Sequence, residues 1–195
     1  MFRTLLAAAL LLAPSTVMAE EWGTFYSKVY GGVTLPNTLV YGSDPTADLN
    51  SGFLAGGSVG LDTGISGLSA ELDVTGSRAA YSIYPGTALD ALTVMGNAVF
   101  AVPVGDRFNV YGGLGAGFVA VKTEDPIPDF VITGVAPAGQ VFGGASVNFA
   151  PNVSLFGEAR FQTAFGTIAG QYANSTPADV GFARTAILAG LKFSQ

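Results

Sequence analysis

Residues 67–77, GLSAELDVTGS, constrain the fold more than any other stretch of the chain. Apolar and polar residues alternate here, with Leu72 and Val74 among the apolar ones and Glu71 and Asp73 between them. Side chains on a strand point to opposite faces with a period of two, so the stretch predicts a strand with one apolar and one acidic face. The alternation alone fits two opposite arrangements, with the apolar face turned either into a protein core or out toward lipid.

The composition favours an apolar face turned toward lipid. Charged residues make up 11% of the chain, against about 25% in an ordinary soluble domain. Beyond Ala19, no apolar run approaches the length of about 20 residues that a transmembrane helix needs. Only helices and closed barrels satisfy every backbone hydrogen bond in lipid, so a chain of this kind is expected to cross a membrane as a β-barrel.

The N-terminus predicts export. A short basic start, MFR, precedes an apolar run at residues 5–13, and the small residues VMA end at Ala19. This is the pattern of a cleaved signal peptide, and the run is too short for a membrane anchor. We therefore expect residues 1–19 to be a signal peptide and residues 20–195 to form one β-barrel domain.

Eight strands follow, and their connections alternate between long and short. The expected strands are residues 25–34, 53–61, 67–77, 91–102, 108–121, 139–149, 153–165 and 180–193. The expected long loops are residues 35–51, 78–90, 122–138 and 166–179, and the short turns are residues 62–66, 103–107 and 150–152. Long loops on one side and short turns on the other predict an all-β fold, an eight-stranded antiparallel up-and-down transmembrane β-barrel.

Phenylalanines gather near both ends of the expected strands, as expected for aromatic belts at the two membrane interfaces. Those near the short turns or chain ends are Phe25, Phe108, Phe149 and Phe193, and those toward the long loops are Phe53, Phe118, Phe161 and Phe165.

Several segments resemble the small outer-membrane β-barrels of Gram-negative bacteria, the OmpA-like transmembrane domain and its surface-antigen relatives. The matching segments are LSAELDVTG, VMGNAVFAVPVGDRFNVYGGLGAG, GGASVNFAPNVSLFGEARFQ and AILAGLKF. The resemblance implies a monomer in the cell outer membrane, in contact with outer-membrane lipid and lipopolysaccharide, whose long loops could meet host or phage ligands. It also implies that Gly190, Leu191 and Phe193 form the signal read by the barrel-insertion machinery, although Ser194 and Gln195 follow where the family usually ends on the aromatic residue.

If the apolar faces meet lipid, charged side chains of several strands point into the barrel. They are Lys28, Glu71, Asp73, Glu158, Arg160 and Arg184, with Lys192 as a further candidate. An eight-stranded barrel is just wide enough for side chains to fill, so we expect a salt-bridged network that plugs the interior. A narrow, gated ion path is the alternative for the same residues.

The residue inventory excludes several kinds of chemistry. The chain has no histidine and no cysteine, which argues against a serine–histidine mechanism and against a transition-metal site. Glu71 and Asp73 could be read as paired catalytic carboxylates, but a filled barrel offers them no substrate cleft.

With a formal net charge of −6, the chain also lacks the basic surface that nucleic-acid binding requires. The acidic residues of the expected long loops fit plain solubility better than a cation site, because their spacing matches no calcium loop; they include Asp44, Asp48, Glu124, Asp125 and Asp129.

The sequence therefore predicts an outer-membrane barrel with a structural or surface-interaction role, and no enzyme, cofactor or metal site. Two alternatives remain open from the residues. One is a narrow, porin-like channel, and the other is a soluble, exported, lipocalin-like barrel that would hold Leu68, Leu72 and Val74 inside around a ligand.

Overall fold

A computed structural model describes residues 24–41, 46–82, 86–124, 130–166, 168–172 and 177–195. These residues form twelve strands: β1 (Phe25–Thr34), β2 (Asn37–Tyr41), β3 (Thr46–Leu49), β4 (Gly52–Asp62), β5 (Leu68–Ala80), β6 (Ala88–Val104), β7 (Phe108–Glu124), β8 (Phe130–Ala150), β9 (Val153–Ala164), β10 (Ile168–Tyr172), β11 (Pro177–Gly181) and β12 (Ala183–Ser194). Within the described ranges, the chain forms no helix long and apolar enough to cross a membrane.

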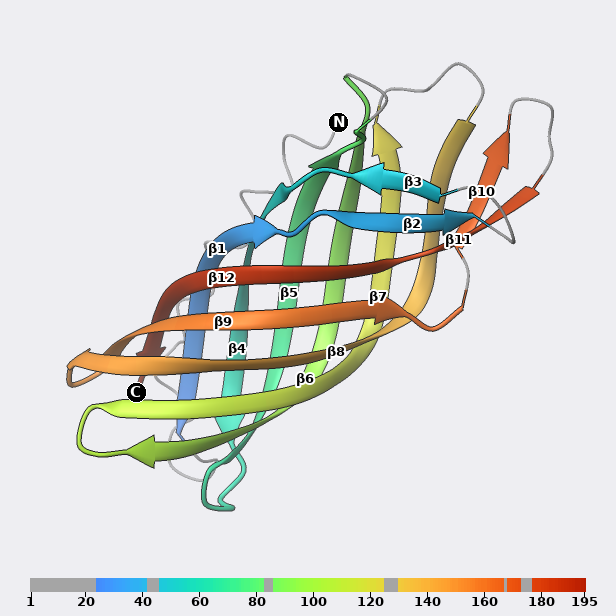
Figure 1. Cartoon of the computed structure of the whole chain (residues 1–195). Coiled ribbons are helices and arrows are strands. Elements are labelled where there is room, and N and C mark those ends of the chain that lie inside the picture. Colours follow the sequence, from blue (N-terminus) through green and yellow to red (C-terminus); the bar gives the residue numbers. More distant parts are fainter. Residues whose placement is uncertain (1–23, 42–45, 83–85, 125–129, 167, 173–176) are drawn as a thin grey trace.

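Eight of the strands close into a barrel. Neighbours pair antiparallel in the order β1, β4, β5, β6, β7, β8, β9 and β12, and β12 pairs back with β1 to complete the ring. The tight β6–β7 and β8–β9 turns lie at the same end as the C-terminus (Figure 1). The predicted eight-stranded antiparallel barrel is therefore confirmed.

The orientation of β5 shows which face of the barrel meets lipid. In β5, Glu71 and Asp73 are buried inside the barrel, with Asp73 0% exposed, while Leu72 is 52% and Val74 41% exposed on the outside. The apolar face thus looks outward, as predicted. The lipocalin-like alternative is wrong, because it placed Leu72 and Val74 in the interior.

The long loops predicted from the sequence are largely strand. β6, β7 and β8 run on into the expected loops, β2 and β3 lie within the expected loop 35–51, β10 lies within the expected loop 166–179, and β11 begins in that loop and ends at Gly181. Asp48 falls in β3, where it accepts a hydrogen bond from Thr38 (2.8 Å), and Glu124 ends β7. Asp44, Asp125 and Asp129 lie outside the described residues.

The four additional strands are outward continuations of barrel strands. Thr34 opposes Gly52 in the β1–β4 ladder, and three residues further on Asn37 opposes Leu49 in the β2–β3 ladder, so the register is kept. The interruption falls at Pro36, which has no N–H to donate to a ladder. The β8–β9 register likewise continues into β8–β10 across Gly166, whose φ of 108° breaks the strand locally.

These continuations close a second section above the first, which we call the outer extension. It consists of β2, β3, β10 and β11 with the outer ends of β5 to β8, opposite the tight turns (Figure 1). Val180 opposes Tyr41 to join β11 with β2. A bridge between Leu49 and Tyr81 joins β3 to the end of β5.

The interior of the outer extension is apolar, so its strands differ from the predicted pattern of apolar residues outside and polar residues inside. Buried side chains inside it form one cluster, made of Leu39, Leu49, Tyr81, Leu89, Ala91, Met95, Val119, Val121, Ala136, Ala138, Ile168, Val180 and Phe182. The outside carries charge instead, because Arg78, Asp90 and Lys122 oppose one another across β5, β6 and β7 and Arg78 pairs with Asp90 at 3.5 Å. Beyond this row the barrel is apolar inside and polar outside. The section below is apolar outside, and its interior combines the charged residues with a second apolar cluster that includes Leu54, Val99 and Leu188.

Between this row and the turns, the outer surface is apolar. The exposed aromatic side chains include Phe53, Phe118, Phe161 and Phe165 toward the outer extension and Phe108, Phe149 and Phe193 toward the turns. Their outward placement agrees with the predicted aromatic belts.

Candidate functional site in the barrel interior

The predicted charged residues converge in the middle of the barrel, because each occupies an inward position on its strand. β1 contributes Lys28, β5 contributes Glu71 and Asp73, β9 contributes Glu158 and Arg160, and β12 contributes Arg184, all buried. With three acids and three bases, the set is formally neutral. Lys192, the further candidate, is only partly buried.

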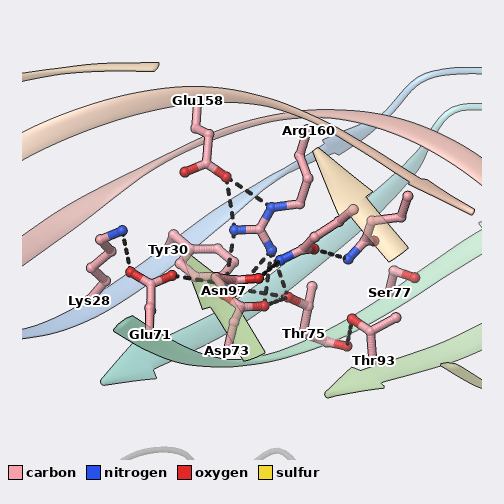
Figure 2. Close-up of polar contacts among 12 residues, drawn as sticks. Lys28, Tyr30, Glu71, Asp73, Thr75, Ser77, Thr93, Asn97, Glu158 and Arg160 are labelled. Atoms are coloured by element: carbon pink, nitrogen blue, oxygen red, sulfur yellow. Dashed lines mark hydrogen bonds and ion pairs between the residues drawn. The ribbon is translucent and has the colours of Figure 1, made fainter. Parts of the chain in front are cut away.

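Arg160 lies at the centre of the interior network (Figure 2). Its Nη1 is 3.0 Å from Asp73 Oδ1, its Nη2 is 2.8 Å from Glu158 Oε1, and its Nε donates to the same Glu158 oxygen at 2.9 Å. Nη1 also donates to the hydroxyls of Tyr30 (3.3 Å) and Thr75 (3.2 Å). One guanidinium therefore holds two buried carboxylates that come from opposite sides of the ring, on β5 and β9.

Hydroxyl groups complete the surroundings of Asp73. Tyr30 donates to Asp73 Oδ2 at 2.5 Å and lies 2.6 Å from the Thr75 hydroxyl, which donates to Asp73 Oδ1 at 2.9 Å. Gly56 makes this arrangement possible, because a Cβ at that position would lie 2.6 Å from the Tyr30 hydroxyl and 2.5 Å from the carbonyl oxygen of Val74. Charge-assisted hydrogen bonds of this kind are what a fully buried carboxylate requires.

Lys28 and Glu71 form a second buried ion pair on the side of the network nearer the turns. Lys28 Nζ is 2.5 Å from Glu71 Oε2, which also accepts a hydrogen bond from Tyr26 at 3.1 Å. The ammonium lies 5.3–5.6 Å from the ring centroids of Tyr26, Tyr111 and Phe156. Cation–π attraction thus adds to the ion pair in holding Lys28.

Arg184 joins the network through neutral groups, and its contacts among the described residues include no ion pair with a carboxylate. Its Nε donates to Gln162 at 2.5 Å, and its terminal nitrogens donate to Ser77 and Thr93. Gln162 then donates to Gln140, and Gln140 donates to Asn97, each at 2.6 Å.

Asn97 completes the chain by donating to Glu71 Oε1 at 3.3 Å. Three amides therefore link Arg184 to the Lys28–Glu71 pair. These amides are absent from the predicted site residues, although Asn97, Gln140 and Gln162 occupy the same inward faces as the charges. Their inward position in the apolar–polar alternation of the strands is the sequence signal that identifies them as interior residues.

The network fills the cross-section of the barrel. Asp73, Thr75 and Thr93 are 0% exposed, so no water-sized sphere reaches them. The apolar cluster of the outer extension forms a second filled layer beyond it. Glu71 and Asp73 are each engaged by a basic side chain, and in the described ranges no group of three His, Cys, Asp or Glu side chains could hold a metal ion.

The residues of the expected insertion signal lie on β12, where it closes the ring against β1. Gly190 opposes Tyr30 in the ladder, and Phe193 is exposed on the outer surface beside the half-buried Leu191. Their recognition by an insertion machinery stays a prediction.

Comparison with known proteins gives a family match and a set of similar folds. The family model described as "Outer membrane protein beta-barrel domain" matches residues 4–191. None of the curated proteins compared with the chain matches it.

Several solved structures share the fold at low sequence identity. Neisserial surface protein A is 18% identical with a TM-score of 0.60, over 88% of this chain and 96% of that one. The outer membrane protein OprG from Pseudomonas aeruginosa is 12% identical with a TM-score of 0.63, over 89% and 97%. AlkL, an outer membrane protein solved in lipid bilayers, is 16% identical with a TM-score of 0.51, over 93% and 94%. At such identities the likeness concerns the fold alone.

Proposed function

Because this chain belongs to the outer membrane protein β-barrel family and resides in the cell outer membrane, we propose that it is a sealed, non-enzymatic barrel that acts through its outer extension, in a structural or surface-interaction role. The observation that carries this proposal is the filling of the interior at two successive levels. Asp73, Thr75 and Thr93 are inaccessible at the charged level, and an apolar cluster occupies the outer level.

A narrow ion channel fits this interior poorly. An ion moving along the axis would have to displace Arg160 from two carboxylates and then cross the apolar cluster around Met95 and Val119. Breaking a buried ion pair costs about 3–5 kcal/mol, and an apolar constriction resists wetting. The outer extension is by contrast a folded surface on the far side of the lipid band, where an external ligand would meet the protein.

Planar-bilayer recording distinguishes the sealed barrel from the channel. We expect the folded wild-type protein to give no unit conductance. Regular current steps in the wild type, with an ion selectivity that changes in Arg160→Ala, would favour the channel and refute the sealed barrel.

Cysteine labelling on intact cells tests whether the outer extension faces outward. Because the chain has no native cysteine, only the introduced cysteine can react with the label. A cysteine replacing the exposed Ser82 should react with a membrane-impermeant maleimide. A cysteine replacing the exposed Asp106, in the β6–β7 turn, should react only after the outer membrane is permeabilised. The opposite labelling pattern would place the proposed interaction surface in the periplasm.

The processing and insertion of the chain belong to the same proposal. We propose that residues 1–19 are removed on export, leaving residues 20–195 as the barrel domain. We also propose that Gly190, Leu191 and Phe193 are read by the insertion machinery. N-terminal sequencing of the membrane protein tests the first point, and residues 1–23 lie outside the described part of the chain.

For the second point, we expect Phe193→Ala to lower the yield of folded barrel in the outer membrane. Phe149→Ala is the control, since Phe149 is also an exposed aromatic residue near the turns. Equal yields from the two variants would contradict a signal role for Phe193.

A further inference from the structure

A polar cavity of about 220 Å³ lies at the turn end of the barrel, below the charged network. Its wall is built from side chains of seven barrel strands and includes two lysines, four serines, two asparagines and two tyrosines, but no carboxylate. The polar members are Tyr26, Lys28, Ser69, Asn109, Tyr111, Ser146, Asn148, Ser154, Lys192 and Ser194. A water takes up about 30 Å³ in the liquid, so the cavity has room for a polyatomic ligand.

The strand register places two positive charges directly opposite each other in this cavity. Lys28 on β1 and Lys192 on β12 are partners in the β1–β12 ladder, and both line the cavity. Like charges at directly opposite positions destabilise a sheet. Some negative charge is therefore needed to make this pairing favourable.

Glu71 neutralises only one of the two lysines. It lies 2.5 Å from Lys28 Nζ, whereas the ion pairs formed by the described residues include none for Lys192. Lys192 Nζ instead lies 4.0 Å from the ring centroid of Tyr26. Two further acids at this end, Asp62 and Asp106, are exposed and do not line the cavity, and Asp62 accepts a hydrogen bond from Ser69 at 2.6 Å.

We propose that this cavity is a binding site for a phosphate group, entered from the periplasmic side, with Lys192 as its principal cationic residue. Serine hydroxyls and asparagine amides on the wall donate hydrogen bonds to the remaining phosphate oxygens. Asn148 is suited to this, since its Oδ1 accepts a hydrogen bond from Ser154 at 2.6 Å, which leaves its amide N–H groups to donate into the cavity that it lines. The phosphate belongs either to a free phosphate ester or to the headgroup of a phospholipid in the inner leaflet, and this site is independent of the surface role proposed above.

The test uses the barrel folded in zwitterionic detergent and titrated with inorganic phosphate, glycerol 3-phosphate and dihexanoyl phosphatidic acid. Binding is followed by calorimetry and by the NMR signal of the lysine ammonium groups. The variants are Lys192→Gln, Lys192→Arg and the control Lys122→Gln, which removes a lysine from the outer end of the barrel. Heat-dependent gel mobility verifies that each variant is folded.

We expect phosphate to bind the wild type, Lys192→Arg and Lys122→Gln alike, and to bind Lys192→Gln about 10- to 100-fold more weakly, as for the loss of a charged hydrogen-bonding partner. Tighter binding of phosphatidic acid than of glycerol 3-phosphate would identify the lipid headgroup as the source of the phosphate, and equal binding would identify the free ester. Absence of binding at millimolar concentration, or binding that Lys192→Gln leaves unchanged, would overturn the proposal.

Stability gives a second readout that a purely structural role for Lys192 would not produce. Without phosphate, removing one of two opposed positive charges should leave the free energy of unfolding unchanged or raise it. With phosphate, only proteins that bind it gain stability, so the wild type should overtake Lys192→Gln. A variant that is less stable than the wild type by the same amount in both buffers would contradict the proposed site.

Discussion

Replacing Arg160 by methionine should destabilise the barrel more than any other single change to its charged residues. The methionine keeps most of the apolar stem of the side chain but removes every hydrogen bond made by the guanidinium. Asp73 and Glu158 would then remain buried without their shared cation, since their side chains are 0% and 1% exposed.

The expected size of the effect follows from this burial. Leaving one charge of a buried pair uncompensated costs about 3–5 kcal/mol. Arg160 compensates two carboxylates at 3.0 and 2.8 Å, so we expect a loss toward the upper end of that range. Arg78→Met is the matched control: its ion pair with Asp90 spans 3.5 Å with both side chains more than a third exposed, and such pairs contribute about 0–1 kcal/mol.

The measurement is a urea titration of the barrel folded into phospholipid vesicles, followed by circular dichroism and by the fraction with folded mobility on unheated gels. Adding Asp73→Asn and Glu158→Gln to Arg160→Met should restore part of the lost stability, because neither position then carries a charge that lacks its cation, and the side chains keep their shapes. If Arg160→Met costs no more than Arg78→Met, the ion pairs of the interior do not stabilise the fold as argued here.

The same titration checks three further expectations. Gly56→Ala should lower the free energy of unfolding by about 1–3 kcal/mol, because the new methyl group meets Tyr30 and the Val74 carbonyl. In the control Gly76→Ala, the new Cβ would have no neighbour closer than 3.9 Å, so the change should stay within about 0.5 kcal/mol. Equal effects of the two substitutions would contradict the close packing around Gly56. Leu72→Arg, in the middle of the lipid band, should lower the free energy of unfolding by about 2–4 kcal/mol, and Val104→Arg, beside a turn, by about 0–1 kcal/mol. A larger loss for Val104→Arg than for Leu72→Arg would contradict this position of the lipid band. Asn97→Ala should lower the free energy of unfolding by about 1–3 kcal/mol, because Glu71 and Gln140 each lose a hydrogen-bond partner. Asn152→Ala, at an exposed position, should leave the stability nearly unchanged. If Asn97→Ala also leaves it unchanged, the chain of amides does not stabilise the barrel.

Strand alternation predicted the lipid-facing section of the barrel well because its outer face is apolar throughout, although the interior holds apolar side chains such as Leu54 and Leu188 beside the charged ones. Leu72 and Val74 face lipid, and Glu71 and Asp73 have no favourable place except the interior. Beyond the row of Arg78, Asp90 and Lys122 the outside of the barrel meets water, so polar side chains face outward and apolar side chains face inward. Leu39 and Leu49 are inward in that region, so a reading based on apolar residues outside could not recognise their strands.

The interior residues could be predicted, but their partners could not. Position in the alternation places Lys28, Arg160 and Arg184 inside the barrel, yet pairing depends on how the ring closes. Arg160 meets Asp73 from 87 residues away, and Arg184 meets amides in place of a carboxylate. Such distances across the interior follow from strand register and barrel closure, which no local pattern in the sequence encodes.

The continuous register from the barrel into its outer extension has a consequence for recognition of the proposed interaction surface. If this surface faces outward as proposed, an antibody, phage or host receptor approaching along β2, β10 or β11 meets strands that already pair with a neighbour on each side. The epitope is then a patch assembled from several strands, and its parts are distant in the sequence. Sera raised against the folded protein should lose binding once the barrel is unfolded, and a linear peptide covering residues 37–49 should compete poorly for them.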